Sequence, residues 1–147
     1  YGTIIQSRDW LPDMIGGVEW LAMDNIATSI YIPVYAGAVD LPEFYKTPGR
    51  DGFTYKSSWW AVNRMSTLAA QRWGDMHKDV DAVFVPMQKE LFDNAPAFEK
   101  EMLELYKKNP KQAQEKLTEY TLFWGNKVVD EAWQLGNDLW TKYDEKF

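Results

Sequence analysis

The sequence predicts an α+β fold in which short antiparallel strands come first and helices follow. Two observations predict it. Residues 1–35 combine β-forming residues with turn residues, whereas the chain after residue 57 repeats apolar residues at intervals of three and four. The 147 residues are 46% hydrophobic and 16% aromatic, which suits a single packed unit. We expect residues 1–56 to hold the strands and a long loop, and residues 57–147 to form a helical region.

Two or three short strands are predicted, among residues 3–6, 18–22 and 29–35. Turn-forming residues separate them, with Gly16 and Gly17 before the second strand and Asp24 and Asn25 after it. This order favours a β-hairpin or a meander. The first strand has nothing ahead of it to pair with, so we expect the chain to continue a fold that begins upstream.

Residues 36–56 are predicted to form a long ordered loop. Glycine and proline occur too often there for a long helix or a central strand, at Gly37, Pro42, Pro48, Gly49 and Gly52. Loops of about 20 residues in compact domains tend to be functional or to cover something. Its aromatic residues give this loop apolar surface to pack down, so we expect it to wall a pocket.

A first helix is predicted from Ser57 or Ser58, as the cap, to Trp73, with Gly74 as its end. A second should run from Asp75 or Val80 to Phe92, bent or begun at Pro86.

A third helix should start with Asn94 as its cap and end near Lys108, and Asn109 with Pro110 is a strong start for the last helix. The apolar repeat of the last helix continues to Tyr143, which predicts a length of about 50 Å.

Eight tryptophans stand in this chain, and their spacing predicts core or interface positions more strongly than ligand platforms. Trp59, Trp73, Trp124 and Trp140 lie on or beside apolar stripes. Trp60 cannot share the burial of Trp59 on a one-faced helix, so we expect it to meet the long loop.

Composition excludes several functions. The net charge of −6 argues against a nucleic-acid partner, and no apolar run reaches the roughly 20 residues of a membrane span. There is no cysteine, and the lone His77, even with Asp81 beside it, is too little for a zinc site. No serine stands in a hydrolase motif and no glycine-rich loop suits a phosphate, so we expect no metal and no cofactor.

Two polar clusters are candidate binding residues. Arg8 follows the first strand beside Asp9, where a guanidinium can pin a loop or receive a substrate carboxylate. Asp24 and Asn25 fit an ordinary turn or a hydrogen-bonding wall.

Several sequence strings resemble the C-terminal part of the C69 family of bacterial cysteine dipeptidases. They are Gln6-Ser7-Arg8-Asp9-Trp10-Leu11-Pro12, Ile15-Gly16-Gly17-Val18 with Trp20, Asp24-Asn25, Tyr31-Ile32-Pro33-Val34-Tyr35-Ala36-Gly37, Leu41-Pro42, Ser58-Trp59-Trp60-Ala61-Val62-Asn63-Arg64, Ala70-Gln71-Arg72-Trp73 and Asp79-Val80-Asp81-Ala82-Val83. The likeness is close over roughly the first 90 residues and general in the terminal helices.

The resemblance implies the C-terminal part of an αββα N-terminal-nucleophile hydrolase, with short antiparallel strands followed by about four helices. In that family a cysteine at the mature N-terminus attacks the peptide carbonyl, and its own amine serves as the base. This chain has no cysteine, so we assign it no catalytic residue and expect the nucleophile upstream. The expected partners are a dipeptide and the N-terminal portion of the same enzyme, and an open strand edge allows a second copy.

For substrate contacts we select Arg8 first, then Asp24 or Asn25, because charge-assisted hydrogen bonds suit the ends of a dipeptide. The family is largely bacterial and some members are exported, while the sequence itself does not fix a location. The alternative function is a non-catalytic helical module that binds a ligand or a protein through its aromatic loop and acidic helices. Composition fits both.

Overall fold

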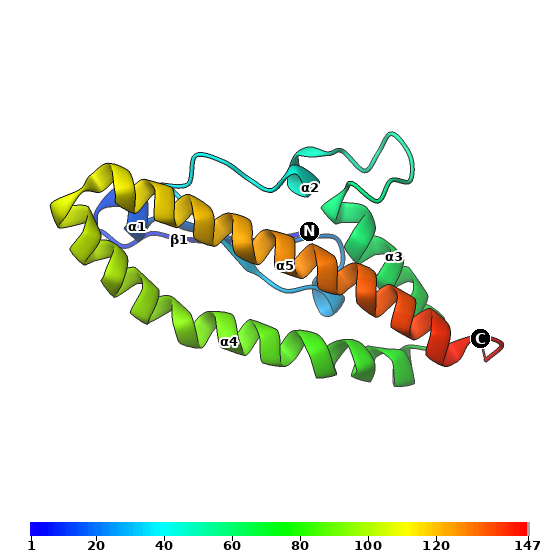
Figure 1. Ribbon diagram of the computed structural model, residues 1–147. Coiled ribbons are helices and arrows are strands. Elements are labelled where there is room, and N and C mark those ends of the chain that lie inside the picture. The colour runs from blue at the N-terminus through cyan, green and yellow to red at the C-terminus, as the bar shows by residue number, and fades with distance from the viewer. Residues whose placement is uncertain (147) are drawn as a thin grey trace.

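A computed structural model describes residues 1–146 and confirms the α+β class (Figure 1). A three-stranded antiparallel sheet is followed by helices. In chain order the elements are β1 (Gly2–Gln6), α1 (Asp13–Gly16), β2 (Val18–Ala22), the 3-10 helix η1 (Ile26–Thr28), β3 (Ile32–Tyr35), α2 (Glu43–Lys46), α3 (Ser58–Gln71), α4 (Trp73–Lys108) and α5 (Pro110–Tyr143).

The sheet is a meander in the order β1-β2-β3, as predicted. Gly2 pairs with Ala22 at one end of the first hairpin and Gln6 with Val18 at the other. The third strand starts at Ile32, later than predicted, because the backbone of Tyr31 bonds to α4 instead. Its N–H donates to Gln88 Oε1 at 2.7 Å, and its carbonyl accepts from Gln88 Nε2 at 3.1 Å.

The link between β1 and β2 is held by the one-turn helix α1. Gly16 ends this turn against the preceding loop, where a Cβ atom would lie only 2.5 Å from the carbonyl oxygen of Arg8. Glycine is therefore required at this close approach. The contact brings Arg8 beside the carbonyls of α1.

The predicted long loop between β3 and α3 contains only the single turn α2. Its aromatic side chains pack against the helices: Phe53 lies 5.4 Å from Trp60 of α3, and Tyr55 lies 4.7 Å from Trp133 of α5, between ring centroids. Trp60 Nε1 donates to the carbonyl of Gly49 at 2.8 Å. The expectation that Trp60 meets this loop is confirmed.

Helix α3 begins as predicted, with Ser57 at the N-cap position, but the Ser57 side chain makes no capping hydrogen bond. The predicted end at Gly74 is wrong. The helix stops at Gln71, Arg72 breaks it with φ −143° and ψ 61°, and Gly74 lies inside the first turn of α4.

The second and third predicted helices form the single helix α4, so the predicted start at Asn94 is wrong. Pro86 and Pro96 both lie inside it. An interior proline costs about 3 kcal/mol, because it removes a hydrogen bond and crowds the preceding turn. A continuous buried stripe spans both prolines and offsets that cost: Met76, Val80, Phe84, Met87, Leu91, Ala95 and Met102.

Helix α5 starts as predicted, with Asn109 Oδ1 accepting from the N–H of Gln112 at 3.1 Å and Pro110 in the first turn. Its 34 residues extend about 50 Å. Figure 1 shows α4 and α5 as a long hairpin with the sheet behind it and α3 beside the later part of α5. Thr121 Oγ1 ties α5 to the sheet by donating to the carbonyl of Pro33 at 3.0 Å.

The main apolar core joins β3 to α3, α4 and α5. Trp124 is 2% exposed within it. The expected burial is wrong for two other tryptophans, since Trp73 is 42% and Trp140 is 54% exposed. Trp73 is the first residue of α4 and stacks on His77 at 4.2 Å, and Trp140 borders a cleft between α3 and α5.

Candidate functional site

Arg8 lies in the loop after β1, where four of its N–H bonds are used. Its Nη1 donates to Glu99 Oε2 at 2.6 Å and its Nη2 to Glu99 Oε1 at 2.8 Å. Nη2 also donates to the carbonyl of Ile15 at 2.9 Å, and Nε to that of Gly16 at 3.3 Å. Since a guanidinium has five N–H donors, at most one is left for a ligand.

Tyr35 completes this cluster by donating its hydroxyl to Glu99 Oε1 at 3.0 Å. Burial raises the pKa of the Tyr35 phenol well above its ordinary value, and the neighbouring Glu99 raises it further. The hydrogen bonds that Arg8 donates to Glu99 likewise raise the pKa of Arg8, although burial opposes this shift. The Arg8–Glu99–Tyr35 cluster therefore keeps its proton donors protonated and joins the β1–α1 loop and β3 to α4.

Asp24 and Asn25 follow β2 at the other end of the hairpin. Asp24 has a positive φ of 53°, a conformation that is uncommon outside glycine, and its Oδ2 accepts from Asn63 Nδ2 of α3 at 3.3 Å. Asn25 Oδ1 accepts from the N–H of Ala27 at 3.1 Å and so caps η1. These contacts fit the interpretation of the pair as turn residues after β2, whereas a hydrogen-bonding wall for a ligand stays a prediction.

The structure does not bring Arg8 together with Asp24 and Asn25. Arg8 comes after Gln6, which pairs with Val18, whereas Asp24 comes after Ala22, which pairs with Gly2. The hairpin between these ends is about 13 Å long, from its four residue steps. The two clusters therefore lie at opposite ends of the sheet.

The long loop walls a cavity of about 440 Å³ near the Asp24 end of the sheet. Met23, the neighbour of Asp24 in the chain, lines one side of it. The remaining lining residues come from the loop and the start of α3: Tyr45, Thr47, Pro48, Gly49, Arg50, Ser58 and Trp59. Burial raises the pKa of Tyr45, so this phenol stays protonated.

Arg50 was not singled out from the sequence, because a single arginine in a glycine-rich loop has no distinguishing pattern. In the structure it gives this cavity a cationic side chain on an exposed loop. Asp24 follows the lining residue Met23 in the chain but does not itself line the cavity. Arg50 is the charged residue among those that line this cavity.

His77 has local partners. Its Nδ1 lies 3.3 Å from Asp81 Oδ2 and its Nε2 lies 3.2 Å from the carbonyl oxygen of Ala27. Within residues 1–146, no group of three or more His, Cys, Asp or Glu side chains is arranged to hold a metal ion. No helix in the same described part of the chain is both long and apolar enough to cross a membrane.

A comparison with family models matches residues 2–85 to the model described as peptidase family C69. The match starts at β1, includes the sheet, the long loop and α3, and ends inside α4 just before Pro86. Since it covers more than half of the chain, this chain belongs to peptidase family C69. No curated protein matches the chain in a direct search.

Proposed function

We propose that this chain is the C-terminal segment of a dipeptidase whose cysteine nucleophile lies outside these 147 residues. The observation that carries the proposal is the match of residues 2–85 to peptidase family C69 in a chain that contains no cysteine. The proposal therefore assigns the thiol nucleophile to another part of the enzyme. On its own, this segment is expected to be inactive.

The proposed reaction is acyl transfer followed by hydrolysis. The cysteine sulfur attacks the peptide carbonyl, its proton passes to the enzyme's free α-amine and then to the leaving amino acid, and a thioester remains. Water attacks that thioester and releases the second amino acid and the thiol. The proposal assigns to this chain the support of that centre and contacts to the substrate.

The shape of the sheet supports a role as part of a larger body. β1 is an edge strand, and within residues 1–146 no other strand pairs with its outer edge. Ile5 is 70% exposed and points away from the face where Trp20 meets Phe92 of α4. Open edges and exposed apolar faces favour pairing with further chain. We propose that the N-terminal portion of the same enzyme covers both, in an αββα arrangement that unites residues 1–56 and 57–147.

For substrate binding we propose Asp24 and Asn25, which follow Met23 of the long-loop cavity in the chain. An aspartate suits the ammonium end of a dipeptide, and Arg50, which lines the cavity, suits its carboxylate end. Arg8 now ranks after Asp24 and Asn25 as a substrate contact. A substrate carboxylate could bind its guanidinium only by displacing Glu99.

The test uses the product of the complete gene. Intact mass and N-terminal sequencing should give a longer chain that opens with cysteine, and dipeptide hydrolysis should cease after thiol alkylation. In that enzyme, Asp24→Asn should raise KM at least about tenfold, the usual loss when a charged hydrogen-bond partner is removed. A native product of only these 147 residues without activity on dipeptides would reject the proposal and favour a binding module.

Arg8→Ala separates the two proposed substrate contacts. If Arg8 binds the substrate, KM should rise in a variant that is still folded. Unchanged kinetics would show that Arg8 does not bind the substrate. The dipeptidase proposal itself would then be decided by the alkylation result.

A further inference from the structure

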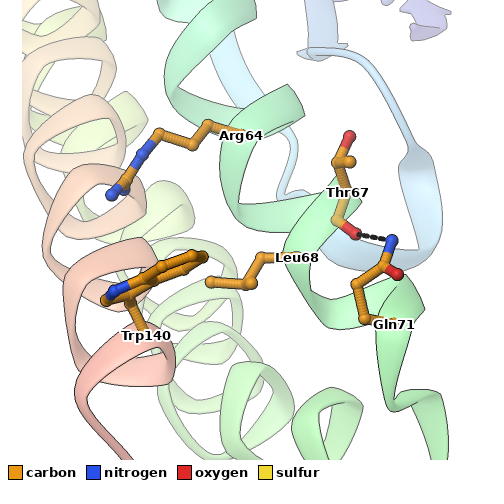
Figure 2. A pocket seen from close by; sticks show the side chains of 5 residues that line it. All are labelled: Arg64, Thr67, Leu68, Gln71 and Trp140. Carbon is orange, nitrogen blue, oxygen red and sulfur yellow. Dashed lines mark hydrogen bonds between the residues drawn. The ribbon is translucent and has the colours of Figure 1, made fainter. Parts of the chain in front are cut away.

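A second cleft of about 440 Å³ lies between α3 and α5 (Figure 2). Four of its lining residues come from one face of α3, since positions 64, 67, 68 and 71 follow helical spacing. The fifth is Trp140 of α5, whose half-exposed indole forms the opposite wall. Figure 2 shows the guanidinium of Arg64 on the same side of the cleft as this indole, with Leu68 beside the ring.

Arg64 is unusual in this cleft because no carboxylate of residues 1–146 forms an ion pair with it. Its single hydrogen bond in the described part of the chain joins Nη2 to Asn137 Oδ1 at 3.2 Å. Nη1 is buried and has no hydrogen-bond partner among residues 1–146. Burying such a donor without an acceptor is costly, and a guanidinium strongly favours a carboxylate.

The backbone of α5 makes room for this side chain. A Cβ atom on Gly136 would lie 2.5 Å from Arg64 Nη1. The absence of a side chain at this position therefore leaves the space in which the guanidinium packs. The guanidinium carbon also lies 5.9 Å from the ring centroid of Trp133. These contacts hold the guanidinium beside the cleft, and its Nη1 makes no hydrogen bond within residues 1–146.

The other walls define the rest of a ligand. Trp140 and Leu68 offer apolar surface, and Gln71 adds an amide that is oriented by donating to the carbonyl of Thr67 at 3.3 Å. One cation beside apolar walls suits a ligand with a single negative charge and an apolar group. A multiply charged phosphate would need more than one cation, in a chain whose net charge is −6.

We propose that the cleft between α3 and α5 binds a small carboxylate that carries an apolar or aromatic group. Its carboxylate accepts hydrogen bonds from Arg64, and its apolar group lies against Trp140 and Leu68. The same chemistry is present in free carboxylic acids and in the C-terminal residue of a peptide. The inference does not rest on the proposed peptide hydrolysis.

The test is an NMR titration of the full chain with 3-phenylpropionate, followed at the tryptophan indole N–H signals. A ligand of this size should bind with a roughly millimolar Kd. The neutral 3-phenylpropanamide has the same shape without the charge, and acetate has the charge without the ring. Each should bind at least about tenfold more weakly, and the Trp140 signal, assigned with Trp140→Phe, should shift with 3-phenylpropionate.

Arg64→Gln should weaken the binding of 3-phenylpropionate about tenfold, whereas the matched charge loss Lys78→Gln on exposed α4 surface should not. Trp140→Ala, a change at a half-exposed position, should weaken it as well. Equal affinity for the acid and the amide in the wild-type chain would overturn the inference even if Arg64→Gln failed to fold. So would the absence of saturation up to about 50 mM.

A tetrapeptide that ends in phenylalanine distinguishes the two sources of the carboxylate. If its free acid binds as tightly as 3-phenylpropionate and its C-terminal amide does not, the cleft accepts peptide ends. If only the small acid binds, the cleft is restricted to small carboxylates, and the inference holds in either case.

Discussion

Two arginines occupy opposite situations in this molecule. Arg8 is bound by Glu99 on both oxygens and by two backbone carbonyls, with only 12% of its side chain exposed. Arg64 has one hydrogen bond, to Asn137, and no acid within the described chain. Whether an arginine can bind a ligand therefore depends on partners that are distant in the sequence. Neither the residue type nor the local motif predicts those partners.

The largest expected effect comes from Glu99→Gln, which leaves the guanidinium of Arg8 charged and part-buried without its anion. Removing one partner of such a pair costs about 3 kcal/mol of unfolding free energy. Chemical denaturation followed by circular dichroism measures this loss.

The matched control is Glu104→Gln on the same helix, where the carboxylate is exposed and pairs with Lys107 at 2.7 Å. An exposed pair of this kind contributes less than about 0.5 kcal/mol. Equal losses for the two variants would show that the Arg8–Glu99–Tyr35 cluster does not stabilise the fold.

Tyr35→Phe tests the third member of that cluster and should cost about 1.5 kcal/mol near neutral pH, because a hydrogen bond to a charged acceptor is lost. It should also change the alkaline limb of the stability curve. Since the folded-state pKa of Tyr35 is raised, its contribution is full below the ordinary pKa of 10.0 and declines as pH rises above it.

The wild-type chain should therefore lose stability more steeply between about pH 10 and 12 than Tyr35→Phe does. Urea denaturation at several pH values gives both slopes. Parallel slopes would contradict the raised pKa, since Tyr45, Tyr120 and Tyr143 are present in both proteins.

Patterns of neighbouring residues were sufficient to predict the sheet and the start of α5. Alternation and turn residues predicted the meander, and Asn109 with Pro110 predicted the start of α5, because each depends on neighbours within a few residues. The same rules failed at Pro86 and Pro96, where packing of the buried stripe of α4 outweighs the local cost of proline.

The candidate sites were less accessible to prediction. Arg8 was selected from its position, but its partner Glu99 lies 91 residues later, and no local pattern joins them. Arg50 lines a cavity and Arg64 lines a cleft. Both form only when the long loop and α5 pack on α3. Polar sites formed by distant elements are visible only in the folded chain.

Arg64→Met measures what Arg64 contributes to stability, for comparison with Arg8. No ion pair within residues 1–146 is broken, and a methionine fills a similar volume beside Trp133, so the free energy of unfolding should change by less than about 1 kcal/mol. Arg8→Met should cost several times more because it leaves Glu99 without its cation. Similar losses for the two variants would mean that Arg64 has a structural role equal to that of Arg8.

Gly136→Ala should have the smallest net effect. The new methyl group would meet Arg64 Nη1 at 2.5 Å, the far end of a flexible side chain that can move aside, while alanine gains about 1 kcal/mol of helix propensity over glycine. Stability should stay within about 0.5 kcal/mol of wild type or rise.

The binding of 3-phenylpropionate should nevertheless weaken in Gly136→Ala, because the displaced guanidinium no longer faces the cleft. Gly125→Ala is the matched control on the same helix: its methyl group would lie 2.6 Å from Cγ of Pro42, a rigid ring, and should cost about 1 to 3 kcal/mol while leaving the cleft unchanged. A Gly136→Ala variant as unstable as Gly125→Ala would show that Arg64 is fixed by its surroundings, and would end the distinction between the two arginines.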